Sequence, residues 1–156
     1  MSKIHYITPE DLTFDKIYEI LTNGNELALS DESAKLIKKS RESLDQKMLN
    51  QTEPIYGINT GFGSLCNKKI SIEDRSALQK NLVMSHACGT GDIVNPQIVQ
   101  LMMLFKAHAL AIGKSGVQLE TVQRIIDMYN NDIIPIVYEQ GSLGASGDLA
   151  PLAHLS

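Results

Sequence analysis

The segment near the end of the sequence places three small residues, Ala145, Ser146 and Gly147, between a glycine and an aspartate. In a tightly bent backbone the amide nitrogen of Gly147 can attack the carbonyl carbon of Ala145, because glycine has no Cβ to block the approach. Loss of one water closes a five-membered ring, and loss of a second water from Ser146 leaves an exocyclic methylene. The product is a 4-methylideneimidazol-5-one, an electrophile that no ordinary side chain supplies. Small residues also form simple turns, so the triplet alone is weak support for this chemistry.

A second unusual loop runs from Tyr56 to Ser64 and has three glycines among residues 57–63. Such a loop can bring a side chain or an amide against a ligand, although a long connector with a packed tyrosine fits the pattern equally well. It is not a phosphate cradle, because no Gly-Lys-Ser/Thr sequence follows it. The segment that contains Ala145, Ser146 and Gly147 is not the nucleophile elbow of a serine hydrolase either. That motif reads Gly-x-Ser-x-Gly, and residues 144–147 lack the residue between the serine and the second glycine.

Helices are the main elements that must position these two loops. Cap and first-turn residues predict helices that begin near residues 9, 31, 72 and 96, the first of them ending near Thr22. A fifth helix has a clean apolar face at i, i+3, i+4 and i+7, made by Val122, Ile125, Ile126 and Tyr129. The helix after residue 96 carries a set of apolar residues at three-and-four spacing. These are Ile98, Leu101, Met102, Phe105 and Ala109.

Strand signals are few. Residues 133–138 are rich in β-branched side chains, but Pro135 reduces them to an extended linker or a short edge strand. The 156 residues suffice for one ordinary domain with a core, and the sequence has no internal repeat or domain linker. The sequence therefore predicts a mainly α fold with little β structure.

Charge and cysteine content exclude several classes of function. Fourteen Lys and Arg against eighteen Asp and Glu give a formal charge of −4, which offers no support for binding nucleic acid or anionic membranes. Cys66 and Cys88 form no metal-binding pattern, so we expect no metal and reduced thiols. The first residues do not read as a signal peptide, and the apolar stretch 101–112 is too short to span a bilayer. We expect a soluble, cytoplasmic protein.

The order and spacing of four sequence phrases resemble the N-terminal region of the aromatic amino-acid ammonia-lyase family. The resemblance runs from about residue 50 to the last residue. The phrases are Tyr56–Gly63, Asn81–Ala87, Gly113–Val117 and Gly141–His154. The resemblance implies a helical fold, a homotetramer whose active sites combine several subunits, and no external cofactor, because the methylideneimidazolone forms autocatalytically from residues 145–147.

The resemblance also assigns roles to single residues. Tyr56 matches the family's catalytic tyrosine, which transfers a proton around the β-carbon of the substrate. Gly63 lets its loop approach the substrate, and Asp148 supports ring closure by a hydrogen bond. His86 matches a histidine that helps to recognise the imidazole in members that act on histidine. Without the resemblance, a structural histidine on the inward face of its helix is the simpler interpretation.

Within the family the Ser85-His86 pair and residues 150–154 are most similar to the histidine-specific members. This similarity implies non-oxidative deamination of L-histidine to trans-urocanate and ammonia. A tyrosine ammonia-lyase on the same scaffold is the alternative enzyme. Because family members continue for several hundred residues, we expect residues 1–156 to be an N-terminal fragment of a larger chain, cut just after the Ala-Ser-Gly motif. A catalytically inert structural piece is therefore the third interpretation, and we expect the fragment alone to be inactive.

Overall fold

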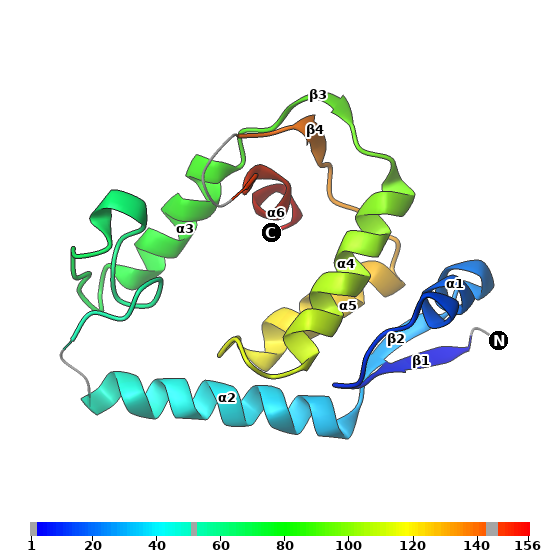
Figure 1. The fold of residues 1–156 in the computed structure, drawn as a ribbon, viewed down its shortest axis with the longest axis horizontal. Helices are drawn as coiled ribbons and strands as arrows, with labels where there is room; N and C mark the ends of the chain where they lie inside the picture. Colours follow the sequence, from blue (N-terminus) through cyan, green and yellow to red (C-terminus); the bar gives the residue numbers. More distant parts are fainter. Residues whose placement is uncertain (1–2, 51–52, 143–146) are drawn as a thin grey trace. The chain divides into compact units, whose positions relative to one another are not determined.

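The computed structural model describes residues 3–50, 53–142 and 147–156. The chain forms two compact units, each built from two separate stretches of sequence (Figure 1). The first unit combines Met1–Asn50 with Asn95–Ile134, and the second combines Gln51–Val94 with Pro135–Ser156. Helices are the main elements of both units, which confirms the mainly α class predicted from the sequence.

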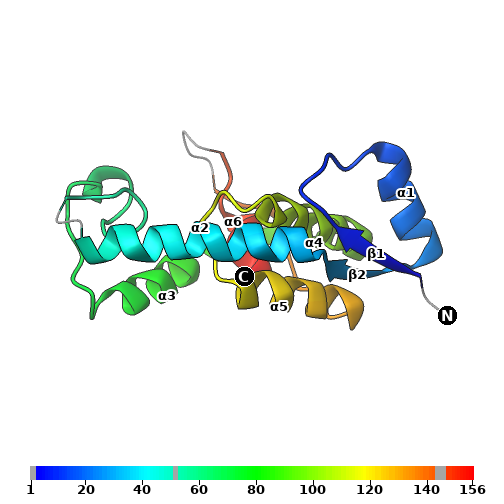
Figure 2. The same ribbon diagram turned by 90° about the horizontal axis from the view of Figure 1, so that it is seen from below.

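The first unit holds two short strands and four helices among its described residues. They are β1 (Ile4–Ile7), α1 (Phe14–Asn23), β2 (Glu26–Leu29), α2 (Asp31–Asn50), α4 (Pro96–Ala111) and α5 (Leu119–Asn130). Strands β1 and β2 lie side by side in parallel, with Ile4 opposite Glu26 and Ile7 opposite Leu29 (Figure 2). Helix α1 connects these two strands, as a parallel pair requires.

All six of these elements contribute to one hydrophobic core, and helices α4 and α5 pack alongside each other (Figure 1). The core residues are Ile7, Ile20, Leu27, Ile37, Leu104, Ala107, Ala111, Val122 and Ile126. The side chain of Asn130 connects α5 to strand β2. Its Oδ1 accepts the N–H of Leu27 at 2.8 Å, and its Nδ2 donates to the carbonyl of Leu27 at 2.8 Å. Both main-chain polar groups of Leu27 are therefore satisfied by one side chain.

The start of α1 differs from the prediction. The helix begins at Phe14 because the side chain of Thr13 accepts the N–H of Lys16 at 3.3 Å and caps it there. Strands β1 and β2, and the short strand β3 described below, were not predicted from the sequence. The helices predicted to begin near residues 31 and 96 do so, and the side chain of Asn95 accepts the N–H of Gln97 at 2.9 Å.

The apolar face predicted for α5 packs into the core through Val122 and Ile126, whereas the apolar residues at three-and-four spacing on α4 are not all buried. Ile98 and Phe105 are 52% and 46% exposed. Apolar side chains surround almost the whole of α4, so periodicity alone gives no contrast between its faces. The residues that α4 buries are Val99, Met103, Leu104, Ala107 and Ala111.

The second unit holds the loop from Tyr56 to Ser64 and the other described elements. They are the 3₁₀ turn η1 (Gly63–Leu65), α3 (Arg75–His86), β3 (Thr90–Ile93), β4 (Tyr138–Gln140) and α6 (Ala150–Leu155). Strands β3 and β4 pair antiparallel, and helix α6 packs against α3 (Figure 1). Of residues 133–138, only Tyr138 enters a strand. Within the described parts of the chain, no helix is both long and apolar enough to cross a membrane.

Candidate active site

A pocket of about 760 Å³ lies in the second unit, between the glycine-rich loop and helices α3 and α6. Three of the residues predicted from the sequence, Tyr56, Gly63 and His86, lie around this one pocket. Apolar side chains make up most of the remaining wall. These other lining residues are Phe62, Ser64, Leu82, Val83, Leu149, Leu152, Ala153 and Ser156.

The glycine-rich loop is shaped by two fully buried polar side chains, Asn59 and Thr60. The Oδ1 of Asn59 accepts the N–H of Ile55 at 2.6 Å, and the Oγ1 of Thr60 accepts the N–H of Gly57 at 3.3 Å. Asn and Thr commonly stabilise turns by bonding to nearby backbone in this way. Neither residue was predicted from the sequence to have a role, although their position between Gly57 and Gly61 was a signal that could have identified them.

Tyr56 lies on this loop with its side chain 63% exposed. Its ring meets the ring of Phe62 edge to face, with centroids 5.8 Å apart. Its hydroxyl oxygen accepts the N–H of Gly63 at 3.4 Å. The side chain is thus held by two neighbours, and Tyr56 is one of the residues that line the pocket.

His86 is the last residue of α3, and its ring is oriented by the preceding turn. Its Nδ1 lies 2.8 Å from the carbonyl oxygen of Leu82. A carbonyl only accepts, so Nδ1 must carry the proton in this contact, and the neutral ring keeps its lone pair on Nε2. The hydroxyl of Ser85 lies 3.0 Å from the same Nδ1 and donates to the same carbonyl at 2.9 Å. The Ser-His pair therefore fixes one tautomer of His86.

Asp148 connects the two sides of the downstream loop. Its Oδ1 accepts the N–H of Ser142 at 2.9 Å and the N–H of Ala150 at 3.0 Å. A Cβ on Gly141 would lie 2.0 Å from Oδ2 of this carboxylate, so only glycine leaves room for it. Neither Ser142 nor Gly141 was predicted from the sequence to have a role, although both lie in the phrase Gly141–His154.

Two of the predicted ring-forming residues, Ala145 and Ser146, lie outside the described residues. The third, Gly147, is described and has φ +93°, a conformation that side chains of L-residues rarely adopt. The structure therefore describes the residues on both sides of this gap, Ser142 before it and Gly147 and Asp148 after it, and a hydrogen bond joins Ser142 to Asp148.

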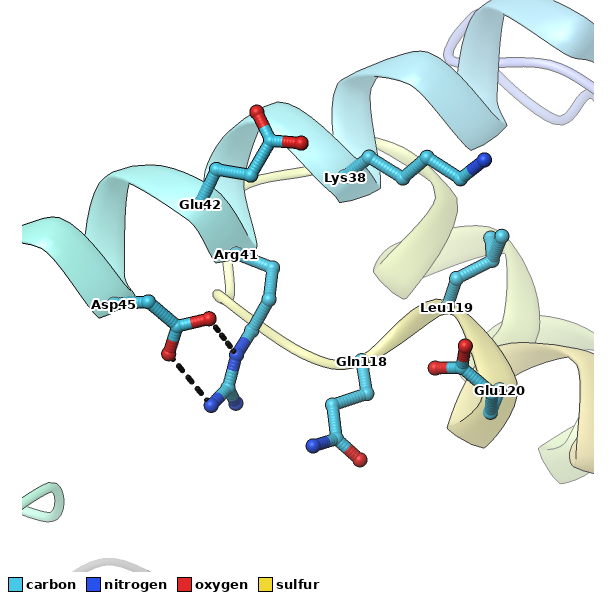
Figure 3. Close-up of a pocket in the computed structure, with 7 residues that line it drawn as sticks. All are labelled: Lys38, Arg41, Glu42, Asp45, Gln118, Leu119 and Glu120. Carbon is cyan, nitrogen blue, oxygen red and sulfur yellow. Dashed lines mark hydrogen bonds and ion pairs between the residues drawn. The ribbon is translucent and has the colours of Figure 1, made fainter.

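A second cavity, in the first unit, has a different character (Figure 3). Its volume is about 460 Å³, and charged side chains of both signs line it. The guanidinium of Arg41 is already paired with the carboxylate of Asp45, at 2.7 Å and 2.9 Å. None of the described residues that were predicted to act in catalysis lines this cavity. Its lining residues are Lys38, Arg41, Glu42, Asp45, Gln118, Leu119 and Glu120.

Comparison with solved structures defines the class of fold. The crystal structure of histidine ammonia-lyase from Trypanosoma cruzi matches with a TM-score of 0.81 and 32% sequence identity. That match covers 98% of this chain and 28% of the other chain. The architecture is therefore the helical ammonia-lyase fold, as the sequence resemblance implied.

Comparison of sequences defines the family. The family model for aromatic amino acid lyases matches residues 12–156, and the chain belongs to that family. It is 46% identical over 149 residues to a histidine ammonia-lyase from Caldanaerobacter subterraneus subsp. tengcongensis, covering 96% of this chain and 29% of that protein. It is 42% identical over 156 residues to a histidine ammonia-lyase from Legionella pneumophila, covering 31% of that protein. The chain thus spans about a third or less of the length of these curated relatives.

Proposed function

We propose that this chain supplies active-site residues of an enzyme that removes ammonia from L-histidine to give trans-urocanate. The observation that supports this most strongly is the pocket of the second unit, where Tyr56, Gly63 and His86 meet. The names of the relatives point to the same substrate. The substrate would be a small amino acid, which a pocket of about 760 Å³ accommodates.

His86 would recognise the imidazole of the substrate. Because its Nδ1–H is occupied by the carbonyl of Leu82, its Nε2 accepts a hydrogen bond from an N–H group of the incoming ring. Leu149 and Leu152 would cover the faces of that ring and exclude water from it. A polar acceptor within an apolar wall favours an aromatic ring that carries an N–H donor, which distinguishes histidine from phenylalanine.

Tyr56 would move the proton at the β-carbon of the substrate. The N–H of Gly63 donates to its phenol oxygen, and this hydrogen bond becomes stronger when that oxygen carries negative charge. The edge of Phe62 limits the rotation of the phenol ring. These neighbours hold the oxygen in position for proton transfer.

The residues around the predicted ring fit a methylideneimidazolone formed from Ala145, Ser146 and Gly147. Gly147 has the positive φ of a tightly bent backbone, and Asp148 accepts from Ser142 and Ala150 on the two sides of the motif. When formed, this group supplies an electrophilic methylidene carbon, so no external cofactor enters the proposal. The contribution of Asp148 is to hold the flanking backbone, which supports ring closure.

The two relatives are much longer than this chain, which covers 29% and 31% of their lengths. We propose that residues 1–156 form the N-terminal part of a longer cytoplasmic polypeptide that assembles as a homotetramer. The isolated 156-residue chain is then expected to lack lyase activity, because further substrate contacts would come from the remaining sequence and from other subunits.

The test is the product that the complete protein forms from L-histidine. We expect one trans-urocanate and one ammonia for each histidine consumed, and no product from the Ser146→Ala variant, which cannot lose the second water. Formation of coumarate from L-tyrosine, with no urocanate from L-histidine, would instead support the tyrosine-specific alternative and reject the proposal.

A further inference from the structure

His154 is a histidine of α6 that neither the resemblance nor the proposed mechanism uses. Its Nε2 accepts the main-chain N–H of Gly89 at 2.9 Å. Its ring stands edge-on to the ring of Tyr138, with centroids 5.3 Å apart and an interplanar angle of 69°. A main-chain N–H only donates, so the imidazole of His154 must be neutral here, with its proton on Nδ1.

Gly89 is fitted to this imidazole. A Cβ at position 89 would lie 2.8 Å from Nε2 of His154 and 3.1 Å from the Cβ of Tyr138. Both distances are shorter than ordinary contacts of a Cβ atom, so a side chain at Gly89 would displace the ring. Three separate segments of the second unit therefore meet at one side chain.

Each of these segments leads to a part of the candidate active site. Gly89 follows His86 by three residues, and the N–H of Cys88 donates to the carbonyl of His86 at 2.8 Å, so the turn between them is short. Tyr138 begins β4, which leads to Ser142, one partner of Asp148. Helix α6 itself supplies Leu152 and Ala153, the two residues immediately before His154, to the pocket wall.

We propose that His154 is a positioning residue that sets the distance between α6 and the end of α3, and thereby the width of the pocket between His86 and the α6 wall. Its catalytic consequence rests on the proposed function, whereas the contact itself does not. The side chain does not reach the substrate in this role, since its Nε2 is already used by Gly89.

Two substitutions in the complete protein separate positioning from bulk stability. His154→Gln provides an amide oxygen that can accept from Gly89, and His154→Leu fills similar space without an acceptor. We expect His154→Leu to raise KM for L-histidine about tenfold with a smaller change in kcat, because one main-chain hydrogen bond is lost. His154→Gln is expected to recover most of that loss. His108→Asn, on α4 in the first unit, is the matched control and should leave KM unchanged.

Gly89→Ala changes the same contact at its main-chain donor instead of at His154. The added methyl group would meet Nε2, so this variant should reproduce the rise in KM of His154→Leu. Combined with His154→Ala, the same substitution should add less than it does alone, because the imidazole of His154 is gone and only the Cβ of Tyr138 remains close to the added methyl group. Fully additive effects of the two substitutions would contradict a shared contact.

Two readouts do not require turnover. Imidazole nitrogen NMR of the labelled protein should show His154 neutral with its proton on Nδ1. The mass of the peptide that contains Ser146 reports the fraction of chains that have lost two waters, and it should be lower in His154→Leu than in His154→Gln. The inference is overturned if folded His154→Leu keeps both the wild-type KM and the wild-type ring content, or if Nε2 carries the proton. Absence of urocanate from the wild type, with these NMR and mass results as expected, would reject the proposed substrate and leave the inference supported.

Discussion

The carboxylate of Asp148 accepts the main-chain N–H of Ser142, six residues earlier, at a distance of 2.9 Å. The same oxygen accepts the N–H of Ala150, the first residue of α6. One side chain thus joins the segment that follows β4 to the start of α6, on the two sides of the Ala-Ser-Gly motif. The position immediately after the triplet is therefore occupied by an acceptor that can organise the backbone on both sides of it.

Replacement of Asp148 should lower the amount of ring that forms. Asp148→Ala removes the partner of the buried Ala150 N–H, and leaving such a group unsatisfied costs about 1–3 kcal/mol. Asp148→Asn keeps one carbonyl acceptor of the same shape. We expect ring content, measured as loss of two waters from the peptide containing Ser146, to fall in the order wild type, Asp148→Asn, Asp148→Ala. Full ring content in Asp148→Ala would exclude a supporting role for this residue.

Replacement of Tyr56 by Phe should reduce kcat far more than it reduces stability. The hydroxyl is the group proposed to move a proton, and positioned acid–base groups typically contribute about 10²–10⁴-fold to the rate. The ring contact with Phe62 remains, and the side chain is largely exposed. Steady-state kinetics and a melting curve measure the two effects. Tyr18→Phe, also an exposed tyrosine, is the control, and an equal loss of activity in both variants would contradict the assignment.

The two amide replacements of His86 should behave differently. The amide of Asn can keep the donor that reaches Leu82, whereas the longer amide of Gln can place an acceptor near the position of Nε2. We therefore expect His86→Gln to keep a lower KM for L-histidine than His86→Asn, with about a tenfold difference for one hydrogen bond. The opposite order would show that Nδ1, and not Nε2, is the important atom.

Titration of His5 should make the protein less stable in mild acid. Burial, and secondarily the positive charge of Lys16, lower the pKa of His5 below the ordinary histidine value of about 6.5, with Glu19 opposing and His108 adding to the shift. Since the neutral form is favoured in the folded state, the unfolded state binds more protons as pH falls below that value. The stabilisation present above about pH 6.5 is then lost as pH falls through the lowered pKa of the folded state.

Chemical denaturation between about pH 7.5 and pH 5 measures this effect. His5→Asn should flatten the dependence of the unfolding free energy on pH across that range. Lys16→Met should weaken the dependence without abolishing it, because burial of His5 remains. An unchanged slope in His5→Asn would show that other groups account for the acid sensitivity.

Removal of the Asn130 side chain should destabilise the first unit. Asn130→Ala leaves the N–H and the carbonyl of Leu27 without their partner, at a cost of about 1–3 kcal/mol for each buried group left unsatisfied. Asn131→Ala is a matched control, because the exposed amide of Asn131 donates within its own helix end, to the carbonyl of Asp127 at 2.8 Å. The difference between the two free energies of unfolding tests the connection between α5 and β2.

Local signals predicted the elements that depend on local interactions. Ser30 and Asn95 cap helices at the predicted places, because a capping side chain bonds to backbone only two or three residues away. Strand β1 was missed because its stability depends on pairing Ile4 with Glu26, after an intervening helix. The spacing of apolar residues on α4 did not indicate its buried face, because apolar residues nearly encircle this helix and tertiary packing decides which of them are buried.

The residues of the candidate site also fall into those that sequence motifs predicted and those that only the folded structure reveals. Tyr56, Gly63 and His86 were predicted from motifs, and the structure brings them to one pocket. Asn59 and Thr60 were missed because their function is to hold the loop that carries Tyr56, which composition does not reveal. His154 was given no role because its partners, Gly89 and Tyr138, lie far from it in the sequence.

The measurement that tests the central claim most directly is a competition between L-histidine and L-tyrosine, supplied together in equal amounts to the complete protein. Products are separated by chromatography, and the peptide containing Ser146 is weighed in the same preparation. We predict trans-urocanate and ammonia in equal amounts, with tyrosine unconsumed. Coumarate without urocanate, or unconsumed histidine in a preparation whose peptide has lost two waters, would contradict the proposed function.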